Sequence, residues 1–202
     1  MKTSILALTL GLLAASPAFA TDFAVMGGTS SASFTSDALL ETIHGTTADV
    51  GGTISVDLSD PASVTGSISF ASTALWTGND MRDSHLHSDD WLGDRQITFE
   101  IASVETGATE LAHGVAAEAT VSGSLTIKGT SQDVSVPATV TFYQIDNPQV
   151  AGTAYIENNL LRVTTQFDIE LSDFGINVPA PLQNKLSNTL SLDVRVTAQQ
   201  TE

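Results

Sequence analysis

Apolar and polar residues alternate one by one along most of the chain. Between residues 52 and 58, for example, Ile54, Val56 and Leu58 alternate with polar side chains. A period of two places the apolar side chains on one face of a β-strand, and helical periodicity is scarce here. The same alternation predicts strands in residues 31–34, 64–70, 97–101, 115–128, 134–142, 154–156, 163–171 and 186–196.

About eight strands of this kind predict an all-β fold. Strands with one apolar and one polar face cannot stand as a flat sheet, so they close into a barrel or stack into a sandwich. Gly123 interrupts the strand at 115–128 and indicates a bulge or a bend. Residues 36–42 predict a short helical turn that begins at Ser36.

The first 20 residues have the pattern of a secretory signal peptide. Lys2 supplies a positive charge, residues 5–15 are apolar, and Ala18-Phe19-Ala20 fits an Ala-x-Ala cleavage site. The apolar run is too short to span a membrane, and the alternative interpretation is a short buried helix. We expect residues 1–20 to be removed, leaving one periplasmic domain of residues 21–202.

The composition is strongly acidic. Only 7 Lys and Arg stand against 23 Asp and Glu, which gives a formal net charge of −16. Such a chain will not bind nucleic acid or an anionic lipid surface by charge. It has no cysteine, so packing and backbone hydrogen bonds must stabilise the fold without disulfides. An edge strand or the acidic exterior could support a homodimer, but no pattern identifies an interface.

The apolar strand faces could point into a barrel or outward into a membrane. Outer-membrane barrels carry aromatic girdles at both interfaces, but aromatic residues form only 6% of this chain. The polar faces consist of Ser, Thr, Asp and Glu, which suits water. We therefore predict an apolar interior and no stable membrane insertion. An eight-stranded barrel holds side chains plus one small ligand, and the pattern alone fits a ligand tunnel and a filled core equally well.

The densest charged segment is residues 77–91, between two predicted strands. Loops of this kind on a β scaffold often carry recognition or chemistry. His85 and His87 would point the same way on a strand and could share a metal ion, but no third ligand stands at a recognisable spacing. Arg82 and Asp83 could tether the loop, or Arg82 could hydrogen-bond the carbonyl or the phosphate of a ligand. We predict no metal site, and with no Gly-x-Ser-x-Gly motif and no cysteine we predict no catalytic residue.

Three blocks resemble the signature of the YceI-like family and occur in the family's order with similar spacing. They are Thr77-Gly78-Asn79 with Arg82-Asp83-x-His85-Leu86, Ser88-x-Asp90-Trp91 and Thr98-Phe99; Gly123-x-Leu125-Thr126-Ile127-Lys128-Gly129; and Ser172-Asp173-Phe174-Gly175-Ile176. With weaker matches from about Phe23 onward, the similarity covers essentially the whole mature chain. Trp91 stands where the family usually has Phe, and Arg95-Gln96 replaces the usual Tyr-Pro, so both differences alter the rim of the implied pocket.

The resemblance implies an eight-stranded antiparallel, lipocalin-like barrel that binds a polyisoprenoid lipid or an isoprenoid quinone. We therefore expect a periplasmic binding or carrier protein for this hydrophobic small molecule, with no cofactor and no enzymatic activity. The alternative is an exported enzyme or stress-defence protein that acts on a bound isoprenoid through His85 and Asp83. Ligand-binding candidates are Phe34, Ile54, Ile68, Phe70, Arg82, Asp83, His85, Leu86, Trp91, Phe99, Ile101, Val121, Leu125, Phe142, Phe167, Ile169, Phe174 and Leu192.

Overall fold

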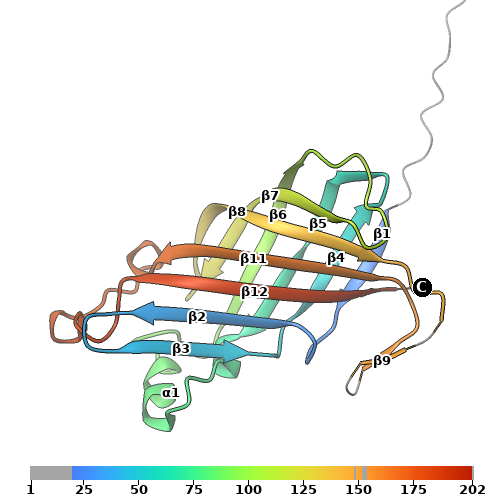
Figure 1. Ribbon diagram of the computed structural model, residues 1–202. Helices are drawn as coiled ribbons and strands as arrows, with labels where there is room; N and C mark the ends of the chain where they lie inside the picture. Colours follow the sequence, from blue (N-terminus) through green and yellow to red (C-terminus); the bar gives the residue numbers. More distant parts are fainter. Residues whose placement is uncertain (1–19, 148, 152–153, 202) are drawn as a thin grey trace, which may run out of the picture.

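Antiparallel strands make up most of the fold (Figure 1). The computed structural model describes residues 20–147, 149–151 and 154–201, so the predicted signal peptide lies almost entirely outside the described residues. The strands are β1 (Thr21–Val25), β2 (Ser31–Asp37), β3 (Thr42–Thr47), β4 (Gly51–Asp57), β5 (Asp60–Ala71), β6 (Gln96–Thr106), β7 (Ala116–Ile127), β8 (Thr130–Tyr143), β9 (Gln149–Ala151), β10 (Ala154–Ile156), β11 (Leu160–Glu170) and β12 (Thr189–Gln200).

Eight of these strands close into a barrel, which confirms the predicted fold class. The order around the barrel is β1-β4-β5-β6-β7-β8-β11-β12, and β12 pairs back with β1. Closure runs through β1, where Phe23 pairs with Ile54 of β4 on one side and with Gln200 of β12 on the other. The alternating apolar residues of each strand therefore share one interior.

The β2–β3 hairpin widens one end of the barrel. The residues of β12 from Ala198 to Gln200 pair with β1, but the residues from Ser191 to Arg195 pair with β2. On the far side of β2 lies β3, whose Thr46 makes a β-bridge to Trp76. The hairpin thus extends the wall at this end and brings it beside the segment that follows β5.

The predicted helical turn at residues 36–42 is wrong. Ser36 lies in β2 and Thr42 begins β3, so this segment is the tip of a hairpin. Pairing with β12 and β3 overrides the local capping signal, and the Ser36 hydroxyl accepts a hydrogen bond from the Ser187 N–H at 2.9 Å instead.

The helical segments lie elsewhere in the chain. They are the α-helix α1 (Asp80–Leu86) and the 3₁₀ turns η1 (Ser72–Ala74), η2 (Leu171–Phe174) and η3 (Ala180–Leu182). The helix α1 falls within the polar segment, and the Asn79 side chain caps it by accepting from the Arg82 N–H at 3.1 Å. Of the helices that the structure describes, none has the length and apolar character needed to cross a bilayer.

The irregularity expected at Gly123 is a bulge in the neighbouring strand. Ile101 of β6 pairs with Gly123, but the next pair is Ser103 with Ser122, so one extra residue of β6 bulges out. A Cβ on Gly123 would lie 2.7 Å from the Phe99 ring, and the backbone can approach this closely only because the residue is glycine.

Candidate functional site

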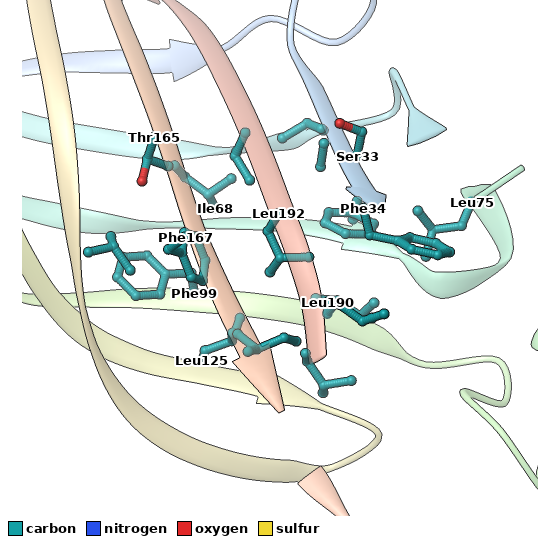
Figure 2. Close-up of a pocket in the computed structure, with 18 of the residues that line it drawn as sticks. Ser33, Phe34, Ile68, Leu75, Phe99, Leu125, Thr165, Phe167, Leu190 and Leu192 are labelled. Atoms are coloured by element: carbon teal, nitrogen blue, oxygen red, sulfur yellow. The ribbon is translucent and has the colours of Figure 1, made fainter. Parts of the chain in front are cut away.

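A large apolar cavity occupies the barrel interior. Its volume is about 540 Å³, within the range of roughly 300–1,000 Å³ typical of sites for small molecules. Figure 2 shows Ile68 of β5, Phe99 of β6 and Phe167 of β11 directed into the same space. The barrel is therefore not filled by its own side chains.

Most of the predicted ligand-binding residues line this cavity. They are Phe34, Ile54, Ile68, Phe70, Arg82, His85, Leu86, Trp91, Phe99, Ile101, Val121, Leu125, Phe167, Ile169 and Leu192. The apolar members come from the inward faces of strands, as period-two alternation requires. The geometry places them on the wall, and contact with a ligand stays a prediction for each of them.

Three predicted residues lie outside the lining of the cavity. Phe142 continues the inward face of β8, but it is 7% exposed and belongs to a buried cluster with Leu111 and Leu161, which do line the cavity. Phe174 is 2% exposed and belongs to η2, where it packs in the core that supports the wall. Asp83 points its carboxylate back into the loop. These three side chains are not part of the cavity wall, and their contact with a ligand stays a prediction.

Sequence reasoning missed several lining residues that lie on irregular segments. Leu75 follows η1, Leu92 follows the helix, and Ile176, Leu182 and Leu186 belong to the segment between η2 and β12. No apolar period marks Leu75, Leu92, Ile176 or Leu182, so alternation could not identify them. Leu186 begins the strand predicted at residues 186–196, although in the structure it lies before β12. Leu190 is different, because it continues the inward face of β12 and the same alternation could have found it.

The cavity opens at the end of the barrel where the helix, the β2–β3 hairpin and residues 176–186 meet. Solvent-exposed residues line it only here among the parts described, and they include Asn79, Met81, His85 and Lys185. The opposite end is lined by buried residues such as Pro61 and Leu111, and the Leu111 N–H donates to the Leu58 carbonyl at 2.7 Å. We call the open end the mouth.

A hydrogen-bond network ties the segments of the mouth together. Arg82 of α1 pairs with Glu41 of the hairpin, with 2.8 Å between Nη1 and Oε1. The same guanidinium donates through Nε to the Thr77 hydroxyl at 2.8 Å and through Nη2 to the Thr77 carbonyl at 3.0 Å. Thr77 then donates from its hydroxyl to Asp83 Oδ1 at 2.6 Å and from its backbone N–H at 3.0 Å. The Arg82 and Asp83 of the sequence signature are therefore structural tethers at the mouth.

The two histidines of the polar segment do not form a pair. His85 belongs to the helix and lines the cavity, whereas the His87 ring bonds the Leu75 carbonyl through Nε2 at 3.0 Å. Residues two apart point in different directions on a helix, so the strand geometry assumed for a shared metal does not apply. In the described part of the chain, no group of three or more His, Cys, Asp or Glu could hold a metal ion.

A closed antiparallel barrel around an apolar cavity is the architecture of the lipocalin-like barrels, whose interiors hold one small ligand. Residues 23–198 match the YceI-like domain, and the chain belongs to this family. A UPF0312 protein of Pseudomonas savastanoi pv. phaseolicola is 29% identical over 96% of this chain and 95% of its own length. Protein YceI of Escherichia coli O6:H1 is 29% identical over 66% of this chain and 63% of its own length.

Solved structures share the fold at lower sequence identity. BcnA of Burkholderia cenocepacia superposes with a TM-score of 0.67 and 18% identity, over 87% of this chain and 99% of that chain. A domain of Saccharophagus degradans, described as a polyisoprenoid binding domain implicated in plant cell wall breakdown, has a TM-score of 0.65 and 14% identity over 89% and 98% of the two chains. At these identities the likeness establishes the barrel fold.

Proposed function

We propose that this protein is a periplasmic carrier that holds the tail of a polyisoprenoid lipid or an isoprenoid quinone inside its barrel. The observation that carries the proposal is the cavity of about 540 Å³ with an almost wholly aliphatic and aromatic wall. Moving each methylene of such a tail out of water is worth about 0.8 kcal/mol. A solved neighbour described as a polyisoprenoid binding domain supports the same class of ligand.

The polar groups of the mouth suit recognition of a headgroup. Arg82, His85 and Lys185 line the cavity near its opening, where the tail would end. Each can donate a hydrogen bond to a carbonyl or hydroxyl oxygen, and a small number of placed donors is enough to orient an apolar ligand. The proposed ligand therefore lies with its tail toward Leu111 and its headgroup beside α1.

Export to the periplasm is the second part of the proposal. It rests on the signal-peptide pattern of residues 1–20, in which cleavage after Ala20 leaves Thr21 at the new N-terminus. In the structure Thr21 is the first residue of β1. The barrel would therefore keep all of its strands after cleavage.

An enzyme acting through His85 and Asp83 is the competing function. Its two residues do not face one another across the cavity, because Asp83 is 8% exposed and its Oδ1 accepts from Thr77. The geometry favours binding without chemistry. His85→Ala is expected to change only the affinity for a quinone, and loss of a measurable turnover in this variant would support the enzyme instead.

A blocked interior tests the carrier function. Ala119 lines the cavity from β7, and Ala116 of the same strand is exposed on the outside. Ala119→Phe fills part of the space that the tail needs, so uptake of ubiquinone from detergent micelles should fall below one molecule per barrel. Ala116→Phe is the matched control and should bind as the wild type does. Equal uptake by the two variants would contradict the proposed site.

A further inference from the structure

Large apolar side chains are exposed around the mouth of the barrel. Leu39 and Leu40, at the tip of the β2–β3 hairpin, are 82% and 67% exposed. Met81 of the helix is 73% exposed and Leu182 of η3 is 39% exposed. We call these four residues the apolar rim. An exposed apolar side chain alone needs no explanation, but a group of them around one opening points to a binding surface.

Backbone and side-chain contacts hold the apolar rim together. The Leu40 N–H donates to the Asn184 carbonyl at 2.8 Å, which joins the hairpin to the segment that carries η3. The Arg82–Glu41 ion pair joins the same hairpin to the helix. Figure 1 shows that α1, the β2–β3 hairpin and the segment before β12 gather at one end of the barrel. The four side chains therefore lie together at one end of the barrel.

The apolar rim is continuous with the cavity. Met81 and Leu182 are exposed to solvent and also line the interior, so an apolar path leads from the outside into the barrel. Each methylene of a prenyl tail that is exposed to water has an unfavourable free energy of transfer. The tail can enter the barrel without crossing water only if the mouth contacts the lipid phase that supplies it.

We propose that the apolar rim docks the protein on the surface of a neutral phospholipid bilayer, with the mouth facing the membrane. The inference rests on the proposed function, because it identifies the source of the lipid as a membrane. The leucines of the hairpin tip would enter the boundary between headgroups and acyl chains, as the apolar face of an interfacial helix does.

The charge of the protein selects a neutral bilayer. The formal net charge is −16, and exposed Asp37 and Asp80 stand close in sequence to Leu39 and Met81 of the apolar rim. Arg82, a cation of the mouth, is already paired with Glu41. Attraction to anionic lipids needs free clusters of Lys and Arg, so docking would be apolar and would weaken as anionic lipid is added.

Vesicle flotation tests this docking without any quinone or isoprenoid present. The test variant is Leu39→Ser with Leu40→Ser, because neither residue lines the cavity and both are exposed. The control is Val115→Ser, which removes a side chain that is 58% exposed and lies just before β7, at the opposite end of the barrel. The vesicles are pure phosphatidylcholine in one series and a mixture with phosphatidylglycerol in the other.

The wild type and Val115→Ser should float with phosphatidylcholine vesicles, and less protein should float as phosphatidylglycerol is added. The double variant should lose roughly tenfold in partitioning for each leucine removed. Docking is overturned if the wild type stays with the soluble fraction or if the double variant floats as the wild type does. A dimer that forms through the apolar rim in place of vesicle binding would also overturn it.

Uptake of ubiquinone from detergent micelles separates this inference from the proposed function. Micelles deliver the quinone without a bilayer, so the double variant should load as fully as the wild type. Failure of the wild type to load would contradict the carrier function and leave the flotation result standing. Normal loading with no flotation would contradict the docking alone.

Discussion

Asp83 shows how one residue of the sequence signature serves the structure of the mouth. Its carboxylate is buried, with 8% of the residue exposed, and Oδ1 accepts from both donors of Thr77. Its other oxygen, Oδ2, is buried with no hydrogen-bond partner among the described residues. Removing the carboxylate would leave the Thr77 N–H without its acceptor, so Asp83 is expected to contribute to stability.

Asp83→Ala should therefore lower the free energy of unfolding by about 1 kcal/mol, because it leaves the part-buried donors of Thr77 without their acceptor. In a barrel of this size, that corresponds to a fall of roughly 2–4 °C in Tm for each kcal/mol. Thermal unfolding followed by circular dichroism measures the change. Asp90→Ala, at an exposed position in the same segment, is the control and should be nearly neutral. Equal effects of the two substitutions would contradict the tethering role.

Asp193 makes the barrel sensitive to acid at one position on its outer face. Hydrogen bonds from Arg195 and then from Gln166 hold the pKa of the Asp193 carboxyl below its ordinary value of 3.8. Because the folded-state pKa is lowered, the stabilisation is complete above the unfolded pKa and is lost as the pH falls through the folded pKa. The pair with Arg195 is partly exposed, so its share is about 0.2–1 kcal/mol.

Asp193→Asn should accordingly lower the free energy of unfolding near neutral pH. Below about pH 4, the difference in this free energy between the variant and the wild type should become smaller. Urea unfolding at a series of pH values gives, for each protein, a curve of the free energy of unfolding against pH. Curves that stay parallel down to the acid limit would show that this carboxyl does not contribute to the acid sensitivity.

At the scale of elements, β4 and β5 approach each other closely where glycines face the partner strand. Gly52 and Gly66 both have φ of +138°, and a Cβ on Gly52 would lie against the Ser67 carbonyl oxygen. Residues other than glycine rarely adopt this backbone conformation. A Cβ here would also meet backbone atoms that cannot move aside. The tight contact helps to close the barrel beside β1.

Gly52→Ala should destabilise the barrel by about 1–3 kcal/mol, from backbone strain together with the clash. Gly51→Ala is a control at the next residue, because a Cβ there meets nothing within 4 Å and the backbone is unstrained. That substitution should leave stability unchanged within about 0.5 kcal/mol or raise it slightly. Chemical denaturation of both variants distinguishes them, and a tolerated Gly52→Ala would contradict the strain described here.

Alternation predicted strands well where a strand has one solvent-exposed face and one buried face. The strands β4 and β11 follow their predicted ranges closely for this reason. The helical turn predicted around Ser36 was wrong, because the capping signal is local. The pairing of this segment with β12 involves residues far away in the chain. The helix α1 was missed because its residues Asp80–Leu86 are too few and too polar to show a helical period.

At the scale of the whole molecule, alternation shows which side chains face inward but not whether they fill the space. That depends on the sum of their volumes, and small residues such as Ala117, Ala119 and Ala138 leave part of the interior empty. The mouth depends on irregular segments whose positions follow from tertiary packing. The family resemblance indicated an open interior, and the cavity inside the barrel agrees with it.

The same cavity reconciles the acidity of the protein with the hydrophobic ligand that we propose. Its charges lie on the polar faces of the strands and in the loops, and the wall of the interior is apolar. Net charge of this size favours a hydrated exterior, and burial of apolar surface would drive binding of the proposed ligand inside. The proposed function thus uses the apolar faces of the strands, and the charged groups lie on the opposite faces of the same strands.

Mass spectrometry of an organic extract tests the central claim most directly. The protein is expressed with residues 1–20 and purified gently from the bacterial periplasm. It is then extracted with organic solvent, and the masses and amounts of the extracted lipids are measured. The account predicts one prenyl lipid or isoprenoid quinone per barrel in the wild type and much less in Ala119→Phe. A folded wild-type protein that yields no such lipid and takes up no added ubiquinone would contradict the carrier function.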